Sequence, residues 1–528
     1  MLVNITEHFI ESGREWQVGQ NPDVPREVAA MWIADGKATA DTDGVRNQSP
    51  VSGGGGKNTC VLLGDSLTRF WSDSTSAPPN VFASGASFVL WLQGFLGARL
   101  RILKNGGVSG NTTAQILARV QSDCIDYSPE WCILCAGTND VSGGVATSVS
   151  TANLAEILSA LTRVNIKVAI FTIPPFASNV STGTRRQALE GINSWVAECA
   201  KSYPGVYVVD AVAATSAGGG TAVSAYSYDT THPSTWGALQ MAVAGFEVLD
   251  PVIPKTKPAG SSNTDPRNAL YNGMLVGDNA TGSNGYAKDA AFAGNGPDGW
   301  YAGRTGASMV ATMSKVARSD FRQSTYWRGA INTGGADGNR LQLTQTINYR
   351  LWSAGGTINA TTRIYVPATG AQYRAVFGGT GALAAGADPT AGWPTAIGQT
   401  FVDGTATLQC VEPIGPGSIC VARATAKVTG VSVGAVWPRI TATFNNAAAS
   451  AQLILIAGQD PTGSGPTSWA TYPECTLETP TFTVPAGFDL SGTTTSAGPS
   501  ILLSMELWTK GGALATVDWH SAFVGQAD

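Results

Sequence analysis

The feature of this sequence that most constrains its fold is an alternation of apolar runs with amphipathic stretches between residues 58 and 252. Short apolar runs lie at 60–63, 100–103, 131–135, 168–173 and 206–209. Stretches with apolar residues at helical spacing lie between and after them, at 113–124, 151–161, 185–200 and 234–249. Apolar strands that alternate with helices are typical of a parallel sheet with helices on both faces. We therefore predict an α/β domain here.

The pattern changes after a linker predicted at 253–264. From residue 265 onward Thr, Val, Ala and Gly dominate, and alternating runs recur at 341–351, 362–366 and 440–456. Many short strands separated by Gly-rich turns indicate an all-β sandwich or jelly roll. We expect four segments: an N-terminal segment with a Gly-rich linker (1–57), the α/β domain (58–252), the linker (253–264) and the β-sandwich region (265–528).

Charge and hydropathy argue against two classes of partner. The 528 residues include 32 Lys and Arg and 37 Asp and Glu, so the formal net charge is −5. Such a chain lacks the basic field that nucleic acid or an anionic membrane surface selects. No apolar run reaches the roughly 18 residues that span a bilayer. The N-terminus has neither a basic start nor an apolar centre, so we expect no secretory signal peptide.

The cysteines do not indicate a disulfide framework, because there are only eight in a long chain. Cys132 and Cys135 form a C-x-x-C pattern inside the apolar run 131–135. An odd offset along a strand sends two side chains to opposite faces. We therefore interpret both as buried small apolar residues and not as a redox pair.

The strongest chemical signal is the tetrapeptide Gly-Asp-Ser-Leu at 64–67, directly after the apolar run 60–63. A serine just past the carboxyl end of a parallel strand, here Ser66, lies where open α/β sheets bind ligands. The N-terminus of a following helix would also stabilise developing negative charge. The alternative interpretation is that Ser66 only caps that helix.

One of the three histidines has a suitable neighbour for catalysis. His232 follows Asp229 in a D-x-x-H pattern, just before the helical stretch 234–249. A carboxylate in the same loop can bind one imidazole nitrogen and leave the other free to act as a base for a serine nucleophile. A single histidine is more often structural, and that is our interpretation of His8 and His520.

Two further loops follow predicted strands and should reach the same sheet edge as Ser66. The first, 105–111, contains Gly110, and the second, 137–140, contains Asn139. Glycine lets a backbone N–H approach a ligand closely, and asparagine offers a side-chain donor. Together they are candidates for an oxyanion hole, although each alone also suits a plain turn.

These four blocks, in this order and spacing, resemble the GDSL (SGNH) hydrolases over residues 58–250. The resemblance implies a flavodoxin-like three-layer α/β/α fold and a serine esterase that needs no cofactor or metal. It also implies Ser66 as nucleophile, His232 as general base and then acid, and Asp229 as the residue that orients His232. The backbone N–H groups of Ser66 and Gly110, with the Asn139 side chain, would form the oxyanion hole.

The chain departs from the family pattern after the first block. Many members carry a glycine soon after it, whereas here residues 68–71 read Thr-Arg-Phe-Trp and a long insertion, 72–97, follows. The insertion is a candidate wall of the cleft. Arg69 and Trp71 are candidates for substrate contact, with a surface salt bridge and a core tryptophan as the alternatives.

Parts of the C-terminal region resemble galactose-binding-like jelly-roll modules. The resemblance lies in 268–274, in 297–300, and in 436–444 with 453–456 as its partner strand. Such modules often bind carbohydrate through exposed aromatic side chains. The candidates are Trp300, Tyr301, Trp327 and Trp352, with core packing as the alternative for each.

Residues 24–38 have apolar residues at helical spacing and resemble the short N-terminal segment of many bacteriophage and prophage tail proteins. The combined resemblances predict a virion tail component, with tail proteins as partners, that removes O-acetyl groups from a polysaccharide at the bacterial surface. A homotrimer is expected by analogy with tail fibres and spikes. The alternatives are a catalytically silent receptor-binding or structural tail protein and a lipase-like esterase of the same family.

Overall fold

The computed structural model describes residues 3–5, 9–11, 14–16, 38–40 and most of 58–527. Within 58–527 the described residues exclude 77–78, 219, 256–262, 264, 283–285, 318–324, 334–336, 352–356, 359–361, 367–370, 376–380, 383–398, 401–406, 446–452, 461–468, 470–471, 487 and 489–498. The chain divides into two compact units, residues 1–54 and 55–528. In the first unit β1 (Val3–Ile5) pairs with β4 (Ala38–Ala40), and β2 (Phe9–Glu11) pairs with β3 (Arg14–Trp16). Residues 24–37 and His8 lie outside the described residues.

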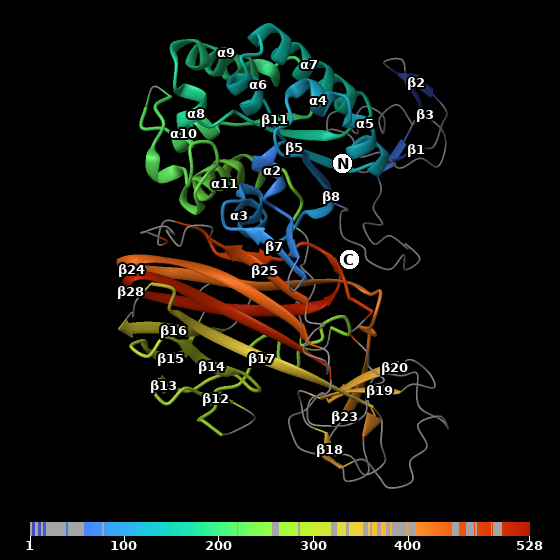
Figure 1. Ribbon diagram of the computed structural model, residues 1–528. Helices are drawn as coiled ribbons and strands as arrows, with labels where there is room; N and C mark the ends of the chain where they lie inside the picture. The colour runs from blue at the N-terminus through green and yellow to red at the C-terminus, as the bar shows by residue number, and fades with distance from the viewer. Residues whose placement is uncertain are drawn as a thin grey trace. The chain divides into compact units, whose positions relative to one another are not determined.

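A five-stranded parallel sheet forms the centre of the α/β domain (Figure 1). Its strands are β5 (Thr59–Gly64), β8 (Arg101–Gly107), β9 (Trp131–Cys135), β10 (Lys167–Phe171) and β11 (Val206–Val209). They lie in the order β11-β10-β9-β5-β8, so the first strand has the second and third as neighbours. This is the flavodoxin-like order, and it confirms the predicted fold class.

Helices cover both faces of this sheet because its strands are apolar on both sides. On one face lie α3 (Phe88–Phe95) and α11 (Thr235–Leu249), and on the other lie α4 (Thr113–Leu117), α5 (Val120–Asp123), α7 (Thr147–Arg163) and α9 (Gly183–Cys199). The strands alternate accordingly: Cys135 joins the first core and Cys132 the second, and both are buried. The two thiols therefore face opposite ways, as predicted.

Short helices complete the domain: α2 (Ser66–Arg69), α6 (Thr138–Gly143), α8 (Ala177–Val180) and α10 (Ala211–Thr215).

The insertion 72–97 joins the α/β domain to the β-rich region. It forms β6 (Asp73–Ser76), β7 (Pro79–Ser84) and then α3. Strand β7 pairs in parallel with β25 (Leu453–Gln459) of the C-terminal region. All eight residues of α3 are buried, as expected for a helix that is apolar on every side. Its Trp91 meets Trp469 edge-on, with ring centroids 5.3 Å apart. The insertion therefore docks on the β-rich region, which the sequence did not indicate.

Two strands of 27 residues each organise the β-rich region: β24 (Ile419–Asn445) and β28 (Ser500–Gln526). They pair antiparallel from Cys420 opposite Gln526 to Asn445 opposite Ser500, with irregularities near Thr425 and Val433. Strand β28 also pairs with β16 (Thr325–Thr333) and β17 (Arg340–Leu351). The predicted pairing of 436–444 with 453–456 is confirmed, because Thr441 lies opposite Ile456 in β24 and β25.

The remaining strands of this region are β12 (Ala287–Lys288), β13 (Ala293–Gly294), β14 (Tyr301–Thr305), β15 (Val310–Ala317), β18 (Thr357–Ile358), β19 (Thr362–Val366), β20 (Ala371–Ala375), β21 (Gly381–Ala382), β22 (Gln399–Thr400), β23 (Thr407–Val411), β26 (Cys475–Glu478) and β27 (Phe482–Thr483). The region after the α/β domain is thus rich in β strands, as predicted, and its assignment as a jelly roll stays a prediction.

The aromatic residues predicted to bind sugar occupy different environments. Trp300 and Trp327 are 0% and 1% exposed, so both are core residues, which was the alternative interpretation. Tyr301 is 40% exposed on β14. Trp352 lies outside the described residues.

Candidate active site

Ser66 lies at the carboxyl end of the first strand, β5, with the ends of β8 and β9 on either side. Ligands of open α/β sheets bind at this reversal of strand order. Asp65 caps α2 by accepting a hydrogen bond of 3.0 Å from the Leu67 N–H, so the capping role is taken by Asp65 and not by Ser66. Gly64 permits the tight turn, since a Cβ there would lie 2.4 Å from the Cys135 carbonyl oxygen.

The loop before α11 brings His232 to Ser66. His232 Nε2 lies 3.0 Å from Ser66 Oγ, and His232 Nδ1 lies 2.7 Å from Asp229 Oδ2. The other oxygen, Asp229 Oδ1, accepts hydrogen bonds of 2.6 and 2.7 Å from the N–H groups of Thr231 and His232. The three predicted residues therefore form one continuous chain of hydrogen bonds.

Electrostatics favour the ionised form of Asp229. Its partial burial would raise the pKa of the carboxyl, but the hydrogen bonds from the His232 ring and from the two backbone N–H groups lower this pKa overall. An ionised Asp229 holds the proton on Nδ1 of the imidazole, which leaves Nε2 as the acceptor that faces the Ser66 hydroxyl.

Gly110 presents a backbone donor near this site. Its φ of +79° is a left-handed conformation that glycine adopts without strain, and the residue is exposed. Within the part of the chain that the structure describes, no hydrogen bond is made by the N–H of either Ser66 or Gly110. Both N–H groups are therefore available to donate hydrogen bonds to an oxyanion.

Unlike the N–H groups of Ser66 and Gly110, the Asn139 amide already makes hydrogen bonds. Its Nδ2 group donates to the Asn111 carbonyl oxygen at 3.0 Å and lies 3.3 Å from Asp65 Oδ2. An amide has two N–H donors, and the contact with Asp65 is the longer one. The Asn139 amide therefore bridges Asp65, next to Ser66, and Asn111, next to Gly110. To stabilise an oxyanion, it would have to donate to that oxygen in place of Asp65 Oδ2.

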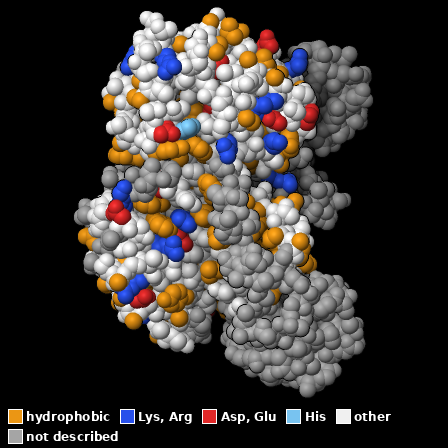
Figure 2. All heavy atoms as spheres, in the orientation of Figure 1, with side chains coloured by type: hydrophobic (Ala, Val, Ile, Leu, Met, Phe, Trp, Pro, Cys, Tyr) orange, Lys and Arg blue, Asp and Glu red, His pale blue; other side chains and the backbone are white. Residues whose placement is uncertain are grey.

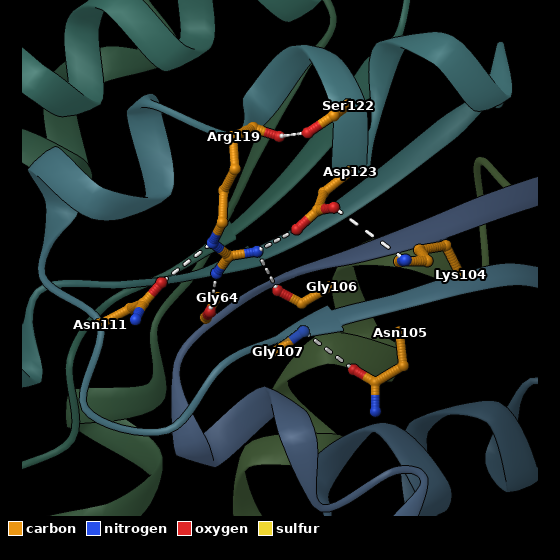
Figure 3. A network of polar contacts seen from close by, with 9 residues as sticks. All are labelled: Gly64, Lys104, Asn105, Gly106, Gly107, Asn111, Arg119, Ser122 and Asp123. Atoms are coloured by element: carbon orange, nitrogen blue, oxygen red, sulfur yellow. Dashed lines mark hydrogen bonds and ion pairs between the residues drawn. The ribbon is translucent and has the colours of Figure 1, made fainter.

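Arg119 connects the strand ends that carry these loops (Figure 3). Its guanidinium donates to the carbonyl oxygens of Gly64 at 2.7 Å and Gly106 at 2.6 Å, which belong to β5 and β8. It also donates to Asn111 Oδ1 at 2.9 Å and to Asp123 Oδ2 at 2.6 Å. One side chain thus fixes the position of the Ser66 turn relative to the Gly110 loop.

Two buried carboxylates support the same loops. Asp140 accepts from the N–H and hydroxyl of Thr113 at 2.8 and 2.6 Å and from the Ser150 hydroxyl at 3.0 Å. Burial raises the pKa of Asp65 to about 7, although its bond from Leu67 opposes this shift. Arg119 and these two carboxylates were not singled out from the sequence, although Asp65 and Asp140 belong to the matched blocks.

Aromatic rings flank the imidazole. The Phe70 ring centroid lies 5.2 Å from that of His232, and the Tyr228 ring stacks on His232 at 5.8 Å. Trp71 is 3% exposed and belongs to the core, which was the alternative interpretation. Arg69 is exposed and donates to Ser109 Oγ at 3.2 Å.

The described residues contain neither a metal-binding cluster nor a helix suited to cross a membrane. No group of three or more His, Cys, Asp or Glu side chains there has the spacing to hold a metal ion. None of the helices in this part of the chain combines the length and apolarity needed to cross a membrane.

Comparison with known proteins identifies the class of the α/β domain. Residues 62–238 match the GDSL-like Lipase/Acylhydrolase family. An acetylxylan esterase of Geobacillus stearothermophilus is 31% identical over 86 residues, which are 15% of this chain and 39% of that relative. The α/β domain is therefore an SGNH hydrolase-like domain with a parallel sheet.

Solved structures resemble this domain at low sequence identity. An α/β hydrolase from the metagenome of Lake Arreo, Spain, has 22% identity and a TM-score of 0.32, and the match covers 38% of this chain and 100% of that one. A catalytic mutant of an acetylxylan esterase from Geobacillus stearothermophilus has 20% identity and a TM-score of 0.31, with coverage of 39% and 99%.

Proposed function

We propose that this protein is a serine esterase that removes O-acetyl or other short acyl groups from a polysaccharide. The observation that carries the proposal is the hydrogen-bonded chain from Ser66 through His232 to Asp229, with distances of 3.0 and 2.7 Å, at the point where the strand order reverses. The family match of residues 62–238 supports an ester hydrolase, and the acetylxylan esterase relative supports a carbohydrate ester.

In the proposed reaction, Ser66 Oγ forms a bond to the ester carbonyl carbon while His232 Nε2 takes the hydroxyl proton. The carbonyl oxygen becomes an oxyanion that the N–H groups of Ser66 and Gly110 and the Asn139 amide stabilise. The bond to the sugar oxygen then breaks, and His232 gives its proton to that oxygen. Water attacks the acyl-enzyme by the same steps and releases the carboxylic acid. Asp229 stabilises the imidazolium form of His232 throughout.

We also propose the biological setting that the N-terminal sequence favours: a component of a phage or prophage tail that acts on an acylated polysaccharide of the bacterial surface. Its support is the resemblance of residues 24–38 to tail proteins, together with the long β-rich region. Association as a homotrimer and contacts with other tail proteins belong to this proposal by analogy.

The test is acetate release from purified O-acetylated polysaccharides, with hydrolysis of 4-nitrophenyl acetate as a parallel assay. We expect Ser66→Ala to reduce both activities by roughly 10⁴-fold, because the variant lacks the nucleophile. Ser148→Ala is the matched control, since Ser148 is an exposed serine on α7, and it should retain wild-type rates.

Each alternative predicts a different result. Full activity in Ser66→Ala would refute the assigned nucleophile. A wild-type protein that hydrolyses neither substrate would favour a silent receptor-binding or structural tail protein. Faster turnover of long-chain than of short-chain 4-nitrophenyl esters would favour a lipase-like esterase.

A further inference from the structure

A cavity of about 290 Å³ opens on the β-rich region, outside the hydrolase site. Its walls come from three strands and two adjoining loops: Trp437 and Arg439 from β24, Gln459 from the end of β25 and Asp460 after it, Trp508 and Lys510 from β28, and Asp337 and Gly338 from the loop before β17. Sites for small molecules begin at about 300 Å³, so the cavity is at the lower end of that range and its size matches a single sugar ring.

Two tryptophans and the arginines packed on one of them form a wall of the cavity, with the guanidinium carbons of Arg439 and Arg340 at 4.6 and 5.1 Å from the centroid of the Trp508 ring. Trp437 and Trp508 lie opposite each other in the pairing of β24 with β28, with ring centroids 6.3 Å apart and planes 21° from parallel. Trp437 is 3% exposed, whereas Trp508 is partly exposed. The Trp508 Nε1–H donates to Glu506 Oε2 at 2.6 Å, which fixes the ring in one orientation. A wall that is ordered in advance lowers the entropic cost of binding.

The polar wall offers donors and acceptors of both charge signs. Arg439 and Lys510 are donors, Asp460 is an acceptor, and Gln459 is both. In the part of the chain that the structure describes, Arg439 Nε is buried without a hydrogen bond, because Glu506 Oε2 lies 3.6 Å away. Arg439 Nε still forms an ion pair with Glu506 and is closed to a ligand, so a sugar hydroxyl would bind the guanidinium through its NH₂ groups.

Figure 2 shows Lys or Arg side chains next to Asp or Glu side chains, with hydrophobic side chains beside them, on the β-rich region. A surface of mixed sign does not select a polyanion. Sugars combine an apolar ring face with hydroxyl groups that both donate and accept, so a cavity with aromatic and mixed polar walls suits them.

The cavity wall also contacts the hydrolase domain near its site. Asp460 accepts a hydrogen bond from the hydroxyl of Thr235, the first residue of α11, three positions after His232. The carbonyl oxygen of Gln459 accepts from the Gly85 N–H at 2.6 Å. The preceding residue, Ser84, bonds through its N–H to the carbonyl oxygen of Phe70, whose ring contacts His232.

We propose that this cavity is a glycan-binding subsite that holds a sugar unit of the same polysaccharide chain whose ester groups Ser66 hydrolyses. The inference rests on the proposed function for its substrate class. It assigns binding to Trp508, Arg439 and Gln459, and not to the aromatic residues that the sequence singled out.

The test measures binding in a Ser66→Ala background, where no turnover disturbs the titration. The probes are acetylated xylan, acetylated glucomannan and an O-acetylated bacterial capsular polysaccharide, each followed by calorimetry. We expect Trp508→Ala to weaken binding of at least one polymer roughly tenfold, in line with the value of an aromatic contact. Gln459→Ala, at an exposed position that leaves the core intact, should weaken it about threefold.

Tyr127→Ala is the matched control, because Tyr127 is an exposed aromatic residue of the hydrolase domain outside the cavity. Its affinity for the polymer should equal that of the parent. With Ser66 restored, the ratio of kcat/KM on the polymer to kcat/KM on 4-nitrophenyl acetate should fall roughly tenfold in Trp508→Ala and stay constant in Tyr127→Ala.

The outcomes separate this inference from the proposed function. Equal polymer affinity in the parent, Trp508→Ala and Gln459→Ala proteins would overturn the subsite, as would absence of binding to all three polymers. If the wild type hydrolyses no ester but polymer binding still depends on Trp508 and Gln459, the esterase fails and the subsite stands.

Discussion

The hydrolase domain and the β-rich region both bury carboxylates, but they satisfy them with different partners. In the β-rich region two of the buried carboxylates bind arginines directly across a strand pair: Arg423 lies opposite Glu478, and Arg328 lies opposite Asp518 with two bonds of 2.7 Å. A directly opposed pair of unlike charges stabilises one register of two strands. These ion pairs therefore help to fix how long strands align.

In the hydrolase domain the hydrogen bonds to buried carboxylates come from neutral donors. Asp65 is bound by the Leu67 N–H and the Asn139 amide, and Asp140 by Thr113 and Ser150. These partners belong to the loops and helix starts around Ser66. Ion pairs thus align strands in the β-rich region, whereas neutral hydrogen bonds position the catalytic loops in the hydrolase domain.

The largest expected effect is on the stability of the β-rich region. Glu478→Gln should reduce the free energy of unfolding by about 3–5 kcal/mol, because it leaves the largely buried Arg423 guanidinium without its counter-charge. The midpoint of urea denaturation measures this, while kcat of the remaining folded enzyme on 4-nitrophenyl acetate should not change. Glu198→Gln is the control, since Glu198 pairs with Lys201 on the surface and such pairs contribute little. An unchanged midpoint in Glu478→Gln would show that this ion pair does not align the strands.

The next effect is a pH dependence specific to Asp65. Its raised pKa of about 7 means that, between about pH 4 and 7, the folded protein holds a proton that the unfolded chain releases. Stability from this group is therefore lost as pH rises. Asp65→Ser keeps an oxygen for the helix cap but removes the titration. Its stability relative to the wild type should improve by about 2 kcal/mol from pH 5 to pH 7, measured by urea denaturation. A difference independent of pH would contradict this origin.

Sequence patterns predicted the parts of the molecule whose signals are local. The five strands and the blocks around Ser66 and His232 each carry their own apolar run or motif, and parallel strands bring their carboxyl ends together. The structure does bring Ser66, His232 and Asp229 into contact. The docking of β7 on β25 had no local signal, because it joins strands separated by more than 350 residues.

Two side chains, Trp508 and Arg119, also lack a local signal and were not predicted from the sequence. Trp508 lies in an alternating strand where nothing marks it apart from core tryptophans such as Trp327. Arg119 lies in a stretch with helical spacing, and three of its four acceptors lie outside that stretch, two of them backbone carbonyls. Backbone acceptors leave no trace in a sequence, so only the fold identifies this contact.

The smallest effect is expected at Arg119 in the hydrolase domain, a charged group that binds mainly neutral acceptors. Arg119→Lys keeps the charge near Asp123 but cannot reach Gly64, Gly106 and Asn111 at once, because lysine lacks the planar fork of arginine. We expect kcat on 4-nitrophenyl acetate to fall roughly tenfold with little change in KM, since a misplaced Gly110 loop weakens binding of the transition state more than of the substrate.

Lys104→Ala is the control for Arg119→Lys, because Lys104 approaches the same Asp123 carboxylate at 4.0 Å but is bound to none of the loops that carry Ser66 or Gly110. It should leave kcat unchanged. If Arg119→Lys lowered the urea midpoint but kept kcat, Arg119 would act like the arginines of the β-rich region, as a group that only aligns strands. A lower kcat at unchanged stability would instead show that Arg119 positions the catalytic loops. Its role would then differ from that of Arg328 and Arg423, which align strands in the β-rich region.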